Sequence, residues 1–259
     1  MVVNVGKRFL KVIIFIVIIS ISLYCERKNN RNDVISKASE EYLSKVDGTK
    51  PGELDSLLIS GVASHGDGNK ALAIRYFEKA YELGDVRGAV KLYELYNTEK
   101  DMEKIKEWEI KAAEMGDAGV QYNLAVGLAN TGKLEEAEKW YLKAAEQGYG
   151  NAQNNLGVIY YNNKNYEKAK NWYLKSAEQG DSDSQNNLGV LYEELGDYKE
   201  AEKWLLESSK KNNVYSYKNL GELYEKFIDN KGKALYWYKK AAEAGDIESK
   251  KKLKELREE

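Results

Sequence analysis

The sequence predicts an all-α fold, an α/α superhelical solenoid of antiparallel helix pairs, and three observations predict it. The first is a fixed period, because the five tryptophans recur at steps of 32 residues with one step of 33. The second is composition: 259 residues contain one proline and 42% hydrophobic residues, which favours helices around a core over a turn-rich sheet. The third is helical spacing of the apolar residues inside each period. A period of this length is typical of stacked repeats, here at Trp108, Trp140, Trp172, Trp204 and Trp237.

Each period is predicted to hold two helices. In the second helix of one unit, apolar residues between Ala137 and Ala145 stand at i, i+3, i+4, i+7 and i+8, the pattern of a helix with a wide buried face. In the first helix, Leu156 and Gly157 share a face, and a glycine there lets a neighbouring helix approach closely. The tryptophans are expected to lie in the core of the stack.

Glycine and aspartate mark the unit ends. A glycine, replaced once by Asn212, ends each second helix in the left-handed conformation, and Asp85, Asp117, Asp181 and Asp246 follow as expected N-caps. Six units are therefore predicted, with a possible N-capping helix before them at 33–46 and a C-terminal capping helix at 246–259. The units, which make up residues 53–245, are 53–84, 85–116, 117–148, 149–180, 181–212 and 213–245.

These motifs carry a family resemblance. The segment LGVLYEELGDYKEAEKWLLESS at 188–209 resembles the tetratricopeptide repeat, and KAAEQG with NAQNNLGVIY at 143–160 resembles its Sel-one-like subtype. The resemblance implies that a protein or peptide partner binds on the concave side, which the first helix of each pair lines. Some cysteine-rich secreted relatives have been linked to penicillin binding or β-lactam hydrolysis, and this chain lacks their cysteines.

The N-terminal residues read as a targeting segment. Residues 1–24 are predicted to be a signal peptide, because three basic residues precede an apolar stretch, 12–24, that is short for a membrane span. Cys25, the only cysteine, follows directly, and its position resembles the lipobox of bacterial lipoproteins, although Ser22 and Tyr24 depart from that pattern. The resemblance implies lipidation at Cys25 and a polar linker within 25–52. An uncleaved anchor is the alternative. Either form predicts attachment to a membrane of the cell envelope, with the solenoid facing the periplasm or the exterior.

A column of asparagines is the candidate binding site. Asparagine is a poor helix former, yet it stands before the repeated leucine of four successive first helices. A carboxamide both donates and accepts, so this column is predicted to bind the backbone of an extended peptide. The alternative is that the amides bond to one another and fix the repeat register. The candidate residues are Asn123, Asn155, Asn187 and Asn219, with Asn154, Asn186, Tyr122 and Tyr161 beside them.

The composition excludes several chemistries. One histidine and one cysteine cannot form a zinc cluster, and no cofactor or metal is expected. A net charge of −2 without a basic stripe argues against nucleic acid. The segment GLANTGK at 127–133 matches part of a phosphate-binding loop, but Leu134 occupies the place of the required Ser or Thr. His65, in the expected loop between the first two helices, lacks a catalytic constellation, so no catalytic residue is predicted.

The sequence therefore predicts a non-catalytic protein–protein interaction scaffold, a lipoprotein-like solenoid of the cell envelope that binds a protein or peptide. Two other functions remain open at this stage. One is a cell-wall or β-lactam-related enzyme like the cysteine-rich relatives, and the other is a spacer that acts by oligomerising.

Overall fold

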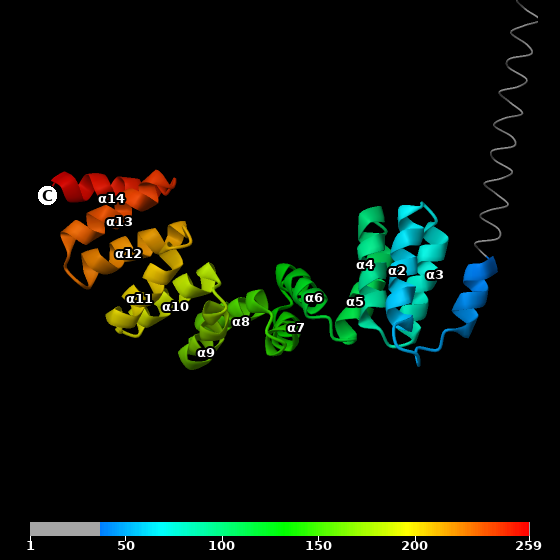
Figure 1. The fold of residues 1–259 in the computed structure, drawn as a ribbon. Helices are drawn as coiled ribbons and strands as arrows, with labels where there is room; N and C mark the ends of the chain where they lie inside the picture. Colours follow the sequence, from blue (N-terminus) through cyan, green and yellow to red (C-terminus); the bar gives the residue numbers. More distant parts are fainter. Residues whose placement is uncertain (1–36, 259) are drawn as a thin grey trace, which may run out of the picture. The chain divides into compact units, whose positions relative to one another are not determined.

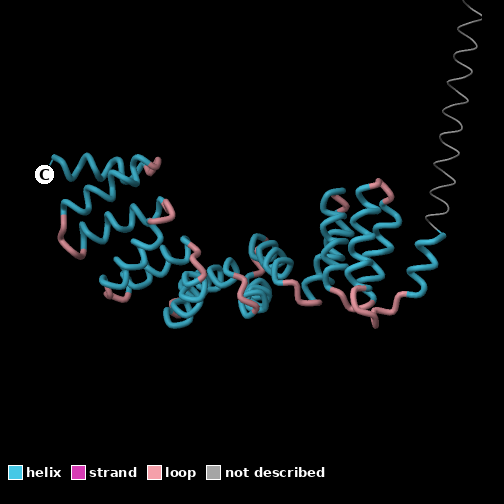
Figure 2. Tube along the Cα trace, in the orientation of Figure 1, coloured by secondary structure: helices cyan, strands magenta, loops and turns pink. Residues whose placement is uncertain are grey.

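The structure, a computed structural model, describes residues 37–258. These residues are helical apart from short connections (Figure 1, Figure 2), and no strand occurs among them. The predicted all-α class is confirmed. The predicted signal peptide 1–24 and Cys25 lie outside the described residues. Among the helices that are described, none is long and apolar enough to cross a membrane.

The described residues divide into two compact units, 37–105 and 106–258. In the first, a helical segment at 37–45 precedes the antiparallel helices α2 (Glu53–Gly66), α3 (Lys70–Glu82) and α4 (Val86–Glu99). Leu43 and Val46, from the N-terminal helical segment and its end, pack on Leu57, Leu72 and Tyr76 of α2 and α3. The segment therefore covers apolar side chains that would otherwise face solvent, as an N-terminal cap does. Helix α5 (Met102–Glu114) runs across the boundary between the units.

The second unit is a succession of helix pairs followed by a last helix. Its first helices are α6 (Ala118–Asn130), α8 (Gly150–Asn162), α10 (Ser182–Glu194) and α12 (Val214–Lys226). Its second helices are α7 (Leu134–Glu146), α9 (Tyr166–Glu178), α11 (Tyr198–Ser209) and α13 (Lys231–Glu243), and α14 (Ile247–Glu258) ends the stack. Among these first helices, α10 also contacts α8 and α12 directly.

Side-chain caps and positive φ angles define the helix ends, as the sequence predicts. Asp117 accepts a hydrogen bond from the Val120 backbone N–H at 2.8 Å, and Asp181 accepts one from Ser184 at 2.7 Å. Such caps satisfy backbone donors that have no partner inside the helix. Asn212, which replaces the repeated glycine, has a φ of 60°, in the left-handed region that asparagine tolerates better than most residues.

Glycines on the first helices bring the two helices of a pair together. The ring of Tyr173 lies directly on Gly157, where a β-carbon would overlap it. A β-carbon on Gly221 would come within 2.6 Å of the Tyr238 ring, and one on Gly189 within 2.6 Å of Leu205. The glycine on one helix thus leaves the space that a large side chain of the other helix fills, and we call this space the glycine socket.

A glutamine ladder joins successive pairs. Gln153 donates to the carbonyl oxygen of Ala145 in the preceding pair at 3.0 Å, and Gln179, at the C-terminal end of the second helix of its own pair, donates to the Gln153 side-chain oxygen at 2.7 Å. Gln121 and Gln147 repeat this arrangement one pair earlier. Gln185 keeps the first bond, to Ala177 at 3.1 Å. The ladder fixes how one pair sits on the next, because buried polar atoms must find partners.

The tryptophans are less buried than predicted. Trp108 is 5% exposed, but the other four are only partly buried. A lysine ammonium covers the ring face instead, at 3.9 Å from the ring centroid for Lys143 over Trp140 and 4.1 Å for Lys175 over Trp172. The tryptophans therefore lie at the edge of the core, where a cation can interact with the ring.

Helix α14 covers the end of the stack with part of its apolar face. Leu253 and Leu256 pack on the cluster that contains Tyr224 and Tyr238. The apolar residues of the predicted capping helix 246–259 also place Ile247 on this inner side, but Ile247 is 83% exposed, so this prediction is wrong. Ile247 is the first residue of α14, the place that the partly buried Val214 holds in α12.

Candidate interaction site on the first helices

The predicted asparagine column lies in the middle of the first helices of the second unit. Asn123 of α6 is exposed, whereas Asn155 of α8, Asn187 of α10 and Asn219 of α12 are partly buried. Asn155, Asn187 and Asn219 each precede a leucine that is fully buried in the core, so these carboxamides stand beside the core and not within it. We call the solvent-facing side of α6, α8, α10 and α12 the first-helix face.

Two carboxamides of the column and the two asparagines beside it, Asn154 and Asn186, form one continuous chain across three helices. Asn219 donates to the side-chain oxygen of Asn186 at 2.8 Å, and Asn186 donates to Asn187 at 3.5 Å. Asn187 in turn donates to Asn154 at 3.0 Å. We call these four residues the amide chain. The hydrogen bonds between neighbouring amides are those of the register-fixing alternative, and they tie α12 to α10 and α10 to α8.

The remaining predicted residues surround the amide chain on the α6 and α8 side. Asn155 hydrogen-bonds with the hydroxyl of Tyr141, whose pKa burial raises and this bond partly lowers. Tyr122 packs between rings of neighbouring helices, with centroid distances of 5.9 Å to Tyr141 and 5.2 Å to Tyr149. Tyr122 is therefore held in an aromatic cluster, and Asn123 beside it is the most accessible amide of the column.

An aromatic and acidic region lies one to two turns further along the same helices. Tyr161 of α8 packs on Tyr166 at 5.6 Å. Burial, then the charge of Glu222 on α12, raises the pKa of the Glu193 carboxyl on α10. The nearby charges of Glu194 and Glu193 raise the pKa of Tyr161 in turn, after the larger effect of burial. Sequence reasoning missed these acidic residues, because Glu194 and Glu222 have no acidic counterpart in the neighbouring pairs.

The arrangement is suited to recognising backbone. Each inner amide of the chain donates one hydrogen bond and accepts one, and each end amide makes only one of these bonds. A carboxamide has two N–H donors and two acceptor lone pairs, so every amide keeps unused groups. Val158 of α8 and Val190 of α10 lie one turn from the asparagine column and add apolar contact area. Helix α10 contacts α8 and α12, whereas α9, α11 and α13 make no comparable contacts with one another. The first helices therefore lie closer together than the second helices, and the first-helix face is the inner side of these pairs.

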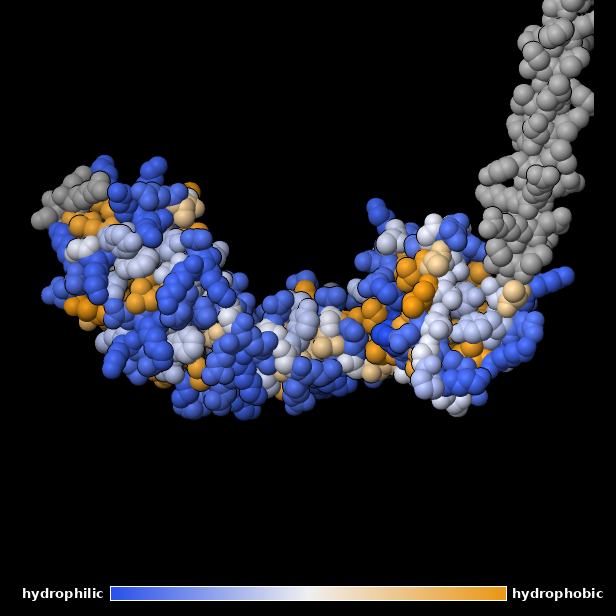
Figure 3. Space-filling model, in the orientation of Figure 1, coloured by the Kyte–Doolittle hydropathy of each residue, from blue (hydrophilic) through white to orange (hydrophobic). Residues whose placement is uncertain are grey.

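No cluster of His, Cys, Asp or Glu in the described part of the chain is suited to hold a metal ion. His65 lies in the last turn of α2 and not in a loop, and it is exposed. Hydrophilic side chains cover most of the visible surface, and hydrophobic ones form small separate patches (Figure 3).

Comparisons with known protein families agree with this architecture. A tetratricopeptide repeat profile matches residues 148–211, and a Sel1 repeat profile matches residues 63–85, 119–149 and 215–246. A search of curated protein sequences gives no significant match.

Solved structures with the same fold include repeat proteins from bacteria. The structure of c5321, a protective antigen of uropathogenic Escherichia coli with an SLR fold, is 30% identical with a TM-score of 0.62 and covers 85% of this chain. The chain spans 51% of the length of c5321. A Sel1 repeat protein from Oxalobacter formigenes is 25% identical with a TM-score of 0.55, over 76% of this chain and 88% of its own. YrrB, described as a tetratricopeptide repeat protein with an unusual peptide-binding site, is 20% identical with a TM-score of 0.53. The match covers 69% of this chain and 97% of YrrB, and it shows the fold alone.

Proposed function

We propose that this chain, which belongs to the Sel1-like repeat family within the tetratricopeptide-like superfamily, is a non-catalytic scaffold that binds an extended peptide segment of a partner protein. Proteins built from these repeats commonly mediate protein–protein interaction. The binding site that we propose is the first-helix face of the second unit.

The amide chain is the observation that carries this proposal. Its carboxamides are held in place by one another, so a peptide would meet them already ordered, and less side-chain entropy would be lost on binding. Asn186 is buried, but Asn154, Asn187 and Asn219 are partly exposed, and their remaining donors and acceptors match the alternating N–H and C=O groups of an extended backbone. Binding to backbone groups makes the affinity depend little on the partner's sequence, while Val158 and the acidic region add preference for particular side chains.

Site-specific cross-linking tests the proposal. A photo-reactive p-benzoylphenylalanine placed at Val158, on the first-helix face, is compared with the same group at Lys139, an exposed residue of the second helix α7. The full chain is cross-linked in envelope membranes, and adducts are identified by mass spectrometry. We expect a defined partner at Val158 and none at Lys139. Equal adducts at both positions would contradict binding at the first-helix face.

Two asparagines outside the amide chain provide the matched variant. Asn123→Ala with Asn155→Ala leaves the bonds between α8, α10 and α12 intact. We expect this variant to keep its helical circular dichroism signal and to lose the Val158 adduct. If the adduct persists at the wild-type yield, these amides do not contact the partner.

We also propose that the scaffold is attached to a membrane of the bacterial cell envelope through a lipid on Cys25. The support is the apolar stretch 12–24 with the lone cysteine directly after it. Metabolic labelling with a palmitate analogue should mark the wild-type chain and leave Cys25→Ser unlabelled. A wild-type chain without label that stays in the membrane fraction would favour the uncleaved anchor.

A further inference from the structure

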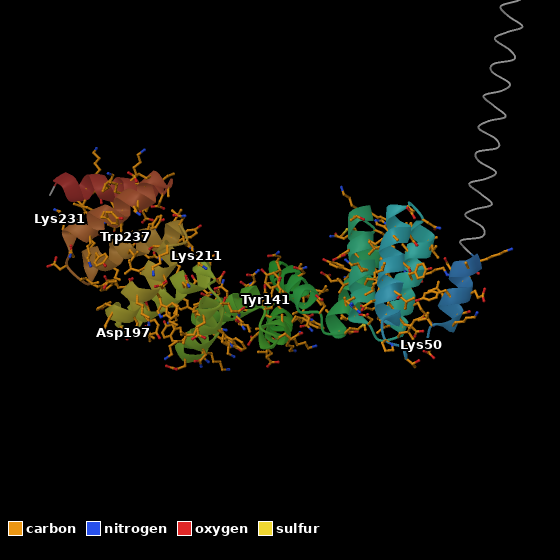
Figure 4. All side chains as sticks on the ribbon, in the orientation of Figure 1. Lys50, Tyr141, Asp197, Lys211, Lys231 and Trp237 are labelled. Carbon is orange, nitrogen blue, oxygen red and sulfur yellow. The ribbon has the colours of Figure 1, made fainter. Side chains whose placement is uncertain are left out.

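A second surface of the second unit is a groove between the second helices α11 and α13. Its volume is about 700 Å³. Helix α11 and its C-terminal end contribute Lys199, Lys203 and Lys210, and α13 contributes Trp237 and Lys240. Figure 4 labels Trp237 on α13. The asparagines of the first-helix face take no part in lining this groove.

A change in the glutamine column accompanies this groove. The position of Gln121, Gln153 and Gln185 is occupied by Tyr217 in the last pair. The Tyr217 ring stacks on Trp237 with centroids 5.8 Å apart and planes at 23°, and its hydroxyl donates to Asn212 at 3.0 Å. The indole is thereby held toward α12, and its partly exposed face forms one wall of the groove.

The charge of the groove is positive. Its two carboxylates already form ion pairs. Glu202 pairs with Lys233 at 3.3 Å, and Glu207 pairs with Lys210 at 2.5 Å. Lys199 and Lys240 make no ion pair with a carboxylate among the described residues. Lys240 lies over aromatic rings instead, 5.7 Å from the Trp237 centroid. These two ammonium groups, one on each wall, leave the groove with uncompensated positive charge.

The dimensions favour a chain segment over a small ion. Lys199 and Lys210 are eleven residues apart on α11 and its end, which is roughly 16 Å along a helix. Leu206 and Trp237 supply apolar surface among the charged residues that line the groove. About five residues of extended chain, at roughly 3.3 Å each, span that length.

We propose that this groove binds an acidic segment of a partner protein, in which carboxylates flank a central apolar side chain. The carboxylates meet Lys199 and Lys240, whose charges are uncompensated, and the apolar side chain lies on Leu206 and Trp237. The site is separate from the first-helix face, so the scaffold binds two different segments, one by backbone recognition and one by charge.

Fluorescence anisotropy with defined peptides tests this inference on the chain that carries residues 25–259. The probe is a fluorescein-labelled peptide, Glu-Asp-Glu-Leu-Phe-Glu-Asp-Glu, and its control replaces every acid by its amide. The acidic peptide should bind, and its affinity should fall as the salt concentration rises, because salt screens exposed charges. The Lys199→Gln and Lys240→Gln double variant should bind about tenfold more weakly. Lys231→Gln with Lys239→Gln, on exposed residues of α13 outside the groove, should bind like the wild type.

Three results would overturn the proposal. Equal binding of the amide peptide would show that the groove is merely apolar, and equal weakening in both double variants would show non-specific attraction to lysines. The third is a concentration-dependent mass in sedimentation that the Lys199→Gln and Lys240→Gln variant abolishes, without binding of the acidic peptide. That result would assign the groove to a second copy of the chain. None of these results bears on the first-helix face, whose test uses other residues.

Discussion

One buried oxygen shows how closely the repeat depends on single residues. Gln185 is 7% exposed, and its side-chain oxygen has no hydrogen-bond partner in the described structure. In the two preceding pairs the equivalent oxygen accepts from Gln147 or Gln179, 26 residues further on. At the corresponding position the chain has Lys211, at the end of α11 (Figure 4), whose ammonium donates to the carbonyl oxygen of Gly180 instead. The unpartnered oxygen is thus a consequence of one substitution in the repeat.

Restoring the glutamine should stabilise the protein. Lys211→Gln supplies the missing donor to Gln185, and we expect the free energy of unfolding to rise by about 1 kcal/mol. Urea denaturation followed by circular dichroism measures the change. Lys211→Met is the control, because it removes the ammonium without supplying an amide. A gain of the same size in Lys211→Met would mean that removal of the lysine charge, and not the hydrogen bond, is responsible.

The raised pKa of Glu193 predicts a dependence of stability on pH. Burial and Glu222 raise the pKa above its ordinary value of 4.5, Glu194 adds to the shift, and Lys226 opposes it. The folded state therefore binds this proton more tightly than the unfolded state does, so stability is lost as the pH rises through the folded pKa. Glu193→Gln should raise the thermal midpoint at pH 7, with a gain that shrinks toward pH 4. Glu135→Gln, on an exposed residue of α7, should change the midpoint little at either pH. A gain for Glu193→Gln that is the same at both pH values would contradict this account.

At the scale of the helix pair, contact depends on the glycine socket. Gly157→Ala places a methyl group against the Tyr173 ring, so the two helices must move apart. We expect a loss of about 1–3 kcal/mol in the free energy of unfolding, measured by urea denaturation.

Gly127→Ala on α6 is the matched control, because no atom lies within 4 Å of its β-carbon position. It should stabilise the helix by about 0.5–1 kcal/mol, since alanine loses less backbone entropy than glycine. If both alanines destabilise the protein equally, close packing is not the reason for the glycine at Gly157.

The helices and part of the candidate site could be predicted from the sequence. Periodicity, caps and left-handed positions are local, and the helices, the Asp117 cap and the φ of Asn212 follow from them. The partners of the asparagines depend on how one pair sits on the next, which no single unit encodes. The groove beside Trp237 depends on Tyr217, a departure from the repeat that gains meaning only from the packing.

At the scale of the whole molecule, a repeat array needs closed ends. Leu256 on α14 is 7% exposed and packs on the last cluster of the second unit. Leu256→Ala should lower the free energy of unfolding by about 2–3 kcal/mol, because a buried aliphatic side chain is lost. Ile247→Ala on the same helix should change it by less than about 0.5 kcal/mol, since Ile247 is 83% exposed. Equal effects of the two substitutions in thermal unfolding would mean that α14 does not cover the end of the stack.

The amide chain also has a direction. Every hydrogen bond in it points the same way, from Asn219 on α12 through α10 to Asn154 on α8. The α8 end therefore finishes in an amino group and the α12 end in an oxygen, and bonds aligned head to tail polarise one another. A peptide lying along the three helices would be bound in one orientation in preference to the reverse. On the proposed function, the amide chain would therefore bind backbone regardless of sequence and still distinguish the N-terminal from the C-terminal direction of the bound chain.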